Sequence, residues 1–329
     1  KKKPEHPTKD YLRLFFTGVT MGAADIVPGV SGGTIAFIFG IYEELLLAIK
    51  TMSGEVPRLI LKGKFKAAWE LIPFHFLIPL GLGLVTAVLS LTNLISHLIE
   101  TQAVLTWSFF FGLVLASVFL VSKRIVTWNL RDIAFLLVFT VAAYQIVGAV
   151  PVETPETPLA FVLAGAIAIC AMILPGISGS FLLLIMGKYE QVITAIKSLD
   201  LITVGFVMVG IILGLALFSR LLSWLFKNYH DIVVASLTGF MIGSLRKIWP
   251  WKETITSRIN SHGVEVPVVQ NNVLPAVFDS GVVWAIVLCV GAMALILLLD
   301  KLQVTKEHVS DLNELDFAKE HEKTLKSQR

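Results

Sequence analysis

One stretch of this chain occurs twice, and both copies carry residues that interrupt a helix. The first copy reads Pro-Gly-Val-Ser-Gly-Gly from Pro28, and the second reads Pro-Gly-Ile-Ser-Gly-Ser from Pro175. At an offset of 147 residues, 11 of the 23 positions from Pro28 to Lys50 are identical in the second copy. Ordinary residue frequencies would give roughly one or two matches in such a window. The chain therefore contains an internal duplication.

Each copy predicts a helix that breaks and then restarts. Proline removes a backbone donor, glycine admits unusual backbone angles, and serine caps the helix that follows. Inside a membrane the freed amides need partners, and the restarting helix presents N–H groups and a positive dipole end, which suits an anion. A packing kink is the alternative, because Gly and Pro are common in transmembrane helices. Two copies in matching positions favour a binding site, as in inverted-repeat transporters.

The composition predicts an integral membrane protein. Hydrophobic residues make up 55% of the chain, charged residues only 16%, and the mean hydropathy is +0.78. The net charge of +3 indicates lysines that flank a membrane rather than a nucleic-acid surface. Cys170 and Cys289 lie in apolar runs, which argues against a disulfide framework. The predicted spans are residues 76–98, 103–122, 133–150, 201–226, 232–245 and 280–299.

We predict an all-α integral membrane protein made of two inverted repeats. Each repeat is a re-entrant helical hairpin, broken at Pro-Gly-x-Ser-Gly, followed by about three transmembrane helices. The first repeat crosses the membrane an odd number of times, so the second starts on the opposite side. The predicted divisions are a basic cytoplasmic leader (1–13), repeat 1 (14–150), an external linker (151–158), repeat 2 (159–299) with an outer loop (246–279), and a cytoplasmic tail (300–329).

Three further patterns refine this topology. Residues 14–24 and 34–48 are the predicted arms of the first hairpin. Residues 50–69 interleave lysines with large apolar residues, which predicts an amphipathic segment on the cytoplasmic leaflet, attracted to anionic lipid. Small residues recur in each half and predict close helix packing, at Gly112, Ala116 and Ser117 and at Gly239, Gly243 and Ser244.

The paired loops, each followed by Gly-x-Tyr-Glu, resemble those of the bacterial and archaeal polyprenyl-phosphate transporter family. The second parts of the two motifs are Gly40, Tyr42 and Glu43, and Gly187, Tyr189 and Glu190. The resemblance implies a protein of the bacterial cytoplasmic membrane, not an enzyme, that translocates undecaprenyl phosphate from the outer to the inner leaflet. This transport recycles the lipid carrier of cell-wall synthesis. The implied partners are the polyprenyl-phosphate lipid and membrane lipids, and a homodimer stays open.

A monophosphate head group needs hydrogen-bond donors in an otherwise apolar protein. The backbone amides and hydroxyls of the two loops can supply them, and two arginines in the second half can add guanidinium groups. Those arginines could instead extend toward the interface from helix ends. The predicted substrate-binding residues are Pro28, Gly29, Val30, Ser31, Gly32, Gly33, Thr34, Pro175, Gly176, Ile177, Ser178, Gly179, Ser180, Arg220 and Arg246.

Three acids near the loops are candidates for proton or sodium coupling. Asp25, Glu43 and Glu190 fall close to membrane depth, where an acidic residue is a functional candidate by default. Asp25 could instead cap the broken backbone, and the glutamates could pair with Lys50 and Lys197. We predict no cofactor and no metal, because His75, His97 and His230 lack paired metal-ligand spacing.

Two other functions compete with lipid translocation. Undecaprenyl-pyrophosphate phosphatases also resemble this pattern, but their loop continues Ser-Arg-Ser and a Glu-rich motif accompanies it. Here Ser31 and Ser178 are followed by Gly32 and Gly179, so the arginine that would stabilise a transferring phosphoryl group is missing. An ion-coupled small-anion transporter would use the same broken helices. Head-group selectivity in a binding assay separates the three.

Overall fold

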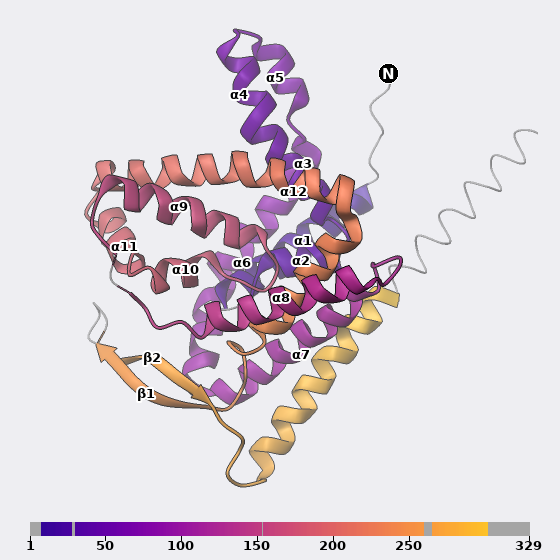
Figure 1. The fold of residues 1–329 in the computed structure, drawn as a ribbon, viewed down its shortest axis with the longest axis vertical. Helices are drawn as coiled ribbons and strands as arrows, with labels where there is room; N and C mark the ends of the chain where they lie inside the picture. Colours follow the sequence, from indigo (N-terminus) through magenta and orange to yellow (C-terminus); the bar gives the residue numbers. More distant parts are fainter. Residues whose placement is uncertain (1–7, 28–29, 153, 260–264, 302–329) are drawn as a thin grey trace, which may run out of the picture.

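The computed structural model describes residues 8–27, 30–152, 154–259 and 265–301 (Figure 1). Pro28 and Gly29, most of the basic leader and the tail after Lys301 lie outside the described residues. The elements are α1 (Thr8–Ile26), α2 (Gly32–Ile38), α3 (Tyr42–Lys50), a π-helical turn (Thr51–Glu55), α4 (Val56–Leu61), α5 (Phe65–Leu71), α6 (Phe74–Thr101), α7 (Ala103–Ser122), α8 (Leu130–Val147), α9 (Pro158–Ile173), α10 (Gly179–Ile185), α11 (Tyr189–Lys197), α12 (Leu201–Ser244), β1 (Lys252–Ile259), β2 (Glu265–Asn272) and a last helix, Ser280–Lys301.

Five helices in the described residues are long and apolar enough to cross a membrane, namely α6, α7, α8, α12 and Ser280–Lys301. They confirm the predicted spans to within a few residues. The two spans predicted at 201–226 and 232–245 belong to the single element α12, which turns at Tyr229 because that residue has non-helical angles (φ −142°, ψ 47°).

The duplication is repeated in the helix boundaries. At the same offset of 147 residues, α2 matches α10, α3 matches α11, and the last residue of α1 matches the last residue of α9. The arm predicted as one helix over 34–48 is divided in both copies, because Gly40 (φ 72°) and Gly187 (φ 66°) adopt the left-handed conformation that ends a helix.

Glycines let the two copies pack in the same way. A Cβ at Gly83 of α6 would lie 2.0 Å from the Phe15 carbonyl of α1, and a Cβ at Gly210 of α12 would lie 2.0 Å from the Val162 carbonyl of α9. The predicted small-residue contacts are also confirmed: Gly112 abuts Cys289 of the last helix, and Gly239 abuts Leu136 of α8. Backbones approach this closely only where no side chain intervenes.

One part of the predicted outer loop consists of β-strands. Residues of 246–279 form an antiparallel hairpin, in which Lys252 pairs with Asn272 and Ile259 with Glu265. The prediction of an all-α chain did not include these strands. Runs rich in Thr, Ile and Val at 254–256 and 266–269 favour extended structure, and they are too short and too polar to cross a membrane.

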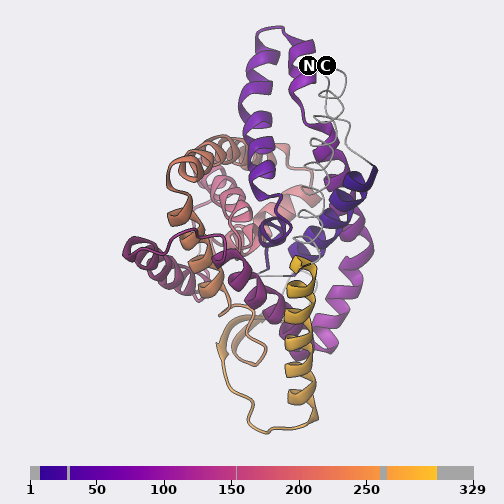
Figure 2. The ribbon, with the colours of Figure 1, turned by 90° about the vertical axis from the view of Figure 1, so that its right-hand side faces the viewer.

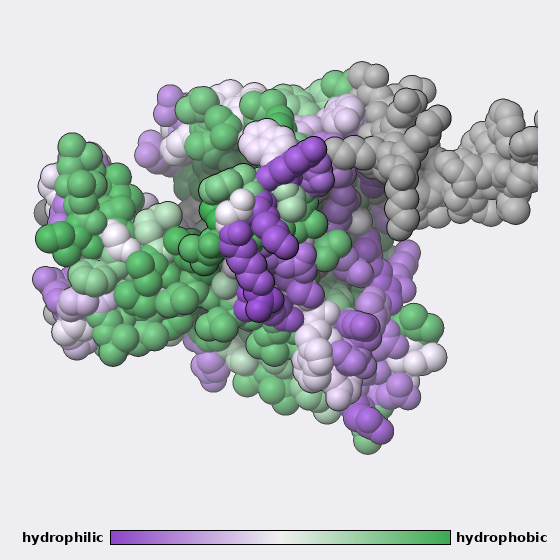
Figure 3. Space-filling model, turned by 90° about the horizontal axis from the view of Figure 1, so that it is seen from above, coloured by the Kyte–Doolittle hydropathy of each residue, from purple (hydrophilic) through white to green (hydrophobic). Residues whose placement is uncertain are grey.

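Helices α4 and α5 project from the body of the molecule (Figures 1 and 2). Leu61, Phe65 and Trp69 are exposed there, Leu61 by 88%, beside Lys62 and Lys66. Viewed onto this end, hydrophobic and hydrophilic residues lie side by side on the surface (Figure 3). Residues 50–69 thus expose large apolar and basic side chains together, while their amphipathic character and their contact with anionic lipid stay predictions.

Candidate functional site

The first loop is closed by its own side chains. Asp25, in the last turn of α1, places its carboxylate at the start of α2, where Oδ1 accepts a hydrogen bond from the Gly32 amide at 2.6 Å. Ser31 caps α2, since its Oγ accepts from the Gly33 amide at 3.1 Å. The Thr34 amide donates to the Ser31 carbonyl. The carboxylate thus occupies the position that the free amides offer to an anion, in agreement with the capping alternative for Asp25.

The two loops touch each other. The Gly176 amide donates to Thr34 Oγ1 at 3.1 Å, and Ser31 Oγ donates to the Leu174 carbonyl at 3.3 Å. Tyr42 Oη donates to the Ile173 carbonyl at 3.0 Å, and both partners are buried. Segments more than 130 residues apart in the sequence therefore meet at one group of buried polar contacts. The break of the helix in each copy leaves backbone groups free to form them.

The second loop is more open than the first. Gly176 has φ 91°, and a Cβ there would lie 2.8 Å from Ser244 Oγ and 3.1 Å from the Met241 Cα, so both conformation and space require glycine. Ser178 and Ser180 share a hydrogen bond of 2.8 Å between their hydroxyls, and Ser180 is exposed. The remaining predicted residues of this loop, Pro175, Ile177 and Gly179, are buried.

An apolar cavity of about 560 Å³ adjoins the first loop. Helices α1, α2, α6, α7 and Ser280–Lys301 supply its walls, and Val30 and Thr34 of the loop form part of its lining. Most of the other lining residues are Leu, Ile, Phe, Val and Ala. Such a cavity accepts hydrocarbon and offers few partners to water.

The structure separates the other predicted residues. Arg220 lies beside the π-helical turn after α3, with Nη2 2.8 Å from the position of a Cβ on Gly54, and is not brought to the loops. Glu43 and Glu190 are exposed in the first turns of α3 and α11, where a helix N-terminus stabilises negative charge.

Arg246 belongs to a cluster of cations that the sequence analysis did not identify. Its Nη1 donates to the Tyr144 carbonyl at 2.9 Å, and its guanidinium lies 4.2 Å from the centroid of the Tyr144 ring. Lys247 Nζ lies 4.4 Å from the Phe181 ring, and Lys252 Nζ lies 4.3 Å from the Trp107 ring.

The two lysines of this cluster have perturbed pKa values. Burial lowers the pKa of the Lys247 ammonium. Burial, together with the nearby charge of Lys247, lowers the pKa of Lys252 to about 7. Lys252 Nζ also donates to the Lys247 carbonyl at 2.6 Å. In the sequence both lysines resemble ordinary loop charges, because residues from α7, α10 and the hairpin surround them only after folding.

A third lysine, outside this cluster, was also missed. Lys188 is fully buried and its Nζ donates to the Thr154 carbonyl (3.0 Å) and to Gln191 Oε1 (2.7 Å). Gln191 in turn donates to Glu156. This network attaches the linker 151–158 to the start of α11. The first copy has Ile41 at the equivalent position, so a comparison of the two copies does not single out Lys188.

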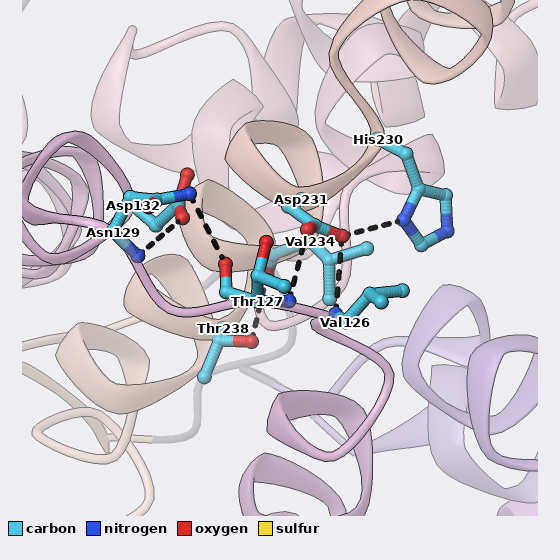
Figure 4. Close-up of polar contacts among 8 residues, drawn as sticks. All are labelled: Val126, Thr127, Asn129, Asp132, His230, Asp231, Val234 and Thr238. Atoms are coloured by element: carbon cyan, nitrogen blue, oxygen red, sulfur yellow. Dashed lines mark hydrogen bonds and ion pairs between the residues drawn. The ribbon is translucent and has the colours of Figure 1, made fainter.

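The turn of α12 is tied to the loop before α8 (Figure 4). Asp231 accepts hydrogen bonds from the amides of Val126 and Thr127, each at 3.3 Å, and pairs with His230 Nδ1 at 3.1 Å. Asp132 is 2% exposed and accepts from the Asn129 amide, which caps α8. Within the described residues, no three His, Cys, Asp or Glu side chains gather as a metal site would require.

Known proteins resemble this chain over most of its length. A family model described as undecaprenyl phosphate translocase-like matches residues 21–266. A polyprenyl-phosphate transporter of Vibrio cholerae serotype O1 is 43% identical over 300 residues, which covers 89% of this chain and 97% of the relative. A polyprenyl-phosphate transporter of Staphylococcus aureus is 34% identical over 254 residues, covering 71% and 84%. No solved structure gave a significant match.

Proposed function

Because this chain belongs to the undecaprenyl phosphate translocase-like family, we propose that it moves undecaprenyl phosphate from the outer to the inner leaflet of a bacterial cytoplasmic membrane. The head group crosses at the two loops, and the polyprenyl tail occupies the apolar cavity. This transport returns the lipid carrier for another round of cell-wall synthesis.

The observation that carries the proposal is the position of the cavity. Its lining is apolar, yet it ends at Val30 and Thr34 of the first loop, which touches the second. Because the walls of this space of about 560 Å³ offer water few partners, hydrocarbon is the occupant that suits it. A molecule with a long apolar tail and a compact anionic head fits a cavity that ends in this way.

The contacts of Asp231 and Arg246 support one crossing that the proposed inverted repeats require. Asp231 contacts the residues just before α8, whereas Arg246 contacts Tyr144 near the end of α8. Because α8 has 18 residues and is about 27 Å long, these contacts lie near opposite ends of a helix long enough to cross a membrane. On this proposal α12 crosses the membrane twice, and both termini are cytoplasmic.

Asp25 is the acid best placed to couple transport to a cation. Its carboxylate holds the Gly32 amide, so protonation would weaken this bond and free donors at the start of α2 for the substrate phosphate. Glu43 and Glu190 stay candidates for the same role, although both are exposed.

The rival functions have weaker support. For a phosphatase, the loop serines would need a neighbouring cation, and each is followed by glycine. For a small-anion transporter, the apolar cavity beside the loop would have no purpose.

The test is translocation of undecaprenyl phosphate by the purified protein in lipid vesicles, with phosphate release from undecaprenyl pyrophosphate followed in parallel. Leu98 of α6 lines the cavity, whereas Leu89 of the same helix is 80% exposed and does not. Leu98→Trp should slow translocation at least tenfold by obstructing the cavity at α6, and Leu89→Trp should leave it unchanged. Equal rates in the two variants would refute the role of the cavity, and release of phosphate at enzymatic rates would favour the phosphatase.

A further inference from the structure

Three cations gather around a small cavity beside α10. The cavity has a volume of about 70 Å³, and Arg246, Lys247 and Lys252 contribute to its wall. The other walls come from the end of α8 and the residues after it, from Phe181 and its neighbours in α10, and from β2. This space holds several waters, or one group the size of a phosphate.

The described residues that line the cavity do not neutralise these cations. Among the described residues that line it, none is acidic. The contacts of the three side chains are instead with aromatic rings and backbone carbonyls: Arg246 with Tyr144, Lys247 with Phe181, and Lys252 with Trp107 and the Lys247 carbonyl. Such contacts orient a cation but leave its charge in place.

Like charges held together away from water repel one another unless an anion joins them. Burial lowers the pKa of both lysines, and the nearby charge of Lys247 lowers the pKa of Lys252 further. A bound anion would offset both the repulsion and the loss of solvation. A guanidinium fork next to two ammonium groups matches the three oxygens of a phosphate monoester.

The cluster also lies next to the second loop. Phe181, whose ring is 4.4 Å from Lys247 Nζ, directly follows Ser180 of that loop. Ser244, whose carbonyl accepts a hydrogen bond from the Lys247 amide, lies directly against Gly176.

We propose that Arg246, Lys247 and Lys252 form a receiving site that binds the phosphate monoester head group of the lipid before it reaches the loops. This inference rests on the proposed function, since it assigns the site by which the same substrate enters.

Binding of farnesyl phosphate and of inorganic phosphate to the full-length protein in detergent tests the site. Lys247→Met and Lys252→Met remove a charge and keep an unbranched side chain over the same ring. Each should weaken the affinity for both probes about tenfold or more, as expected when a charged hydrogen-bond donor is lost. Lys252→Arg, which keeps the charge, should stay near the wild-type affinity.

Lys123 is the matched control. Its Nζ lies 4.4 Å from the Phe119 ring, the distance that Lys247 keeps from Phe181, but it is located at the other end of α7 from Trp107. Lys123→Met should bind both probes as the wild type does. Wild-type affinity in Lys247→Met and Lys252→Met, or an equal loss in Lys123→Met, would overturn the site. If the wild type binds the probes through this cluster but does not move undecaprenyl phosphate in vesicles, the site stands and the proposed function fails.

Discussion

Replacing Lys252 with methionine should make the protein more stable at pH 6. In the folded chain the pKa of Lys252 falls from 10.5 to about 7, first because of burial and then because of the charge on Lys247. The unfolded chain thus binds this proton more tightly than the folded chain does. The charge therefore lowers the free energy of unfolding by its full amount below pH 7, and the free energy of unfolding rises again as the pH increases from about 7 toward 10.5.

The size of the effect follows from these values. At about 1.4 kcal/mol per pH unit, the Lys252 charge destabilises the folded state by at most roughly 4–5 kcal/mol. This destabilisation is about 2–3 kcal/mol after discounting for the part of the side chain that stays near water. Methionine cannot donate to the Lys247 carbonyl, and the loss of that hydrogen bond reduces the gain in stability by about 1 kcal/mol. The net gain of about 1–2 kcal/mol corresponds to a rise in Tm of about 2–6 °C.

Thermal unfolding followed by tryptophan fluorescence, in detergent and in buffers free of phosphate, measures this difference. The gap between Lys252→Met and the wild type should be widest at pH 6 and should narrow by pH 9. Added farnesyl phosphate should raise the Tm of the wild type more than that of the variant. A variant that is less stable at pH 6, or a gap that widens with pH, would refute the argument that Lys252 carries an uncompensated charge.

Three other predictions concern the loops and the topology. Thr34→Val should lower stability by about 1–3 kcal/mol, because the buried Gly176 amide loses its acceptor; an unchanged Tm would mean that the contact between the loops contributes nothing. Gly176→Val should abolish binding of undecaprenyl phosphate while the protein still inserts, whereas Ser178→Ala should weaken this binding about tenfold. Equal affinities of these two variants for the lipid would contradict the anion site. Single cysteines at Lys64 and Glu156 should react with a membrane-impermeant reagent from opposite sides of the membrane, and labelling from one side would exclude the inverted arrangement.

Local patterns in the sequence determined the number and position of most elements. The run 103–122 has no charged residue and became α7 with the same limits, because a span depends on length and hydropathy alone. The repeated loop predicted where helices break, since Pro, Gly and Ser act on their own backbone. The matching bounds of α2 and α10 follow from that local chemistry.

Only the tertiary structure decided what those breaks contact. The bond between the Gly176 amide and Thr34 Oγ1 joins residues 142 positions apart, and no periodicity records that distance. The capping of Gly32 by Asp25 was one of two alternatives until the geometry of the turn was known. Lys247 and Lys252 gather beside Phe181 and Trp107 because α7, α10 and the hairpin pack there. Their charge is unusual only in that enclosed position, since a lysine's pKa depends on its surroundings and not on its neighbours in the chain.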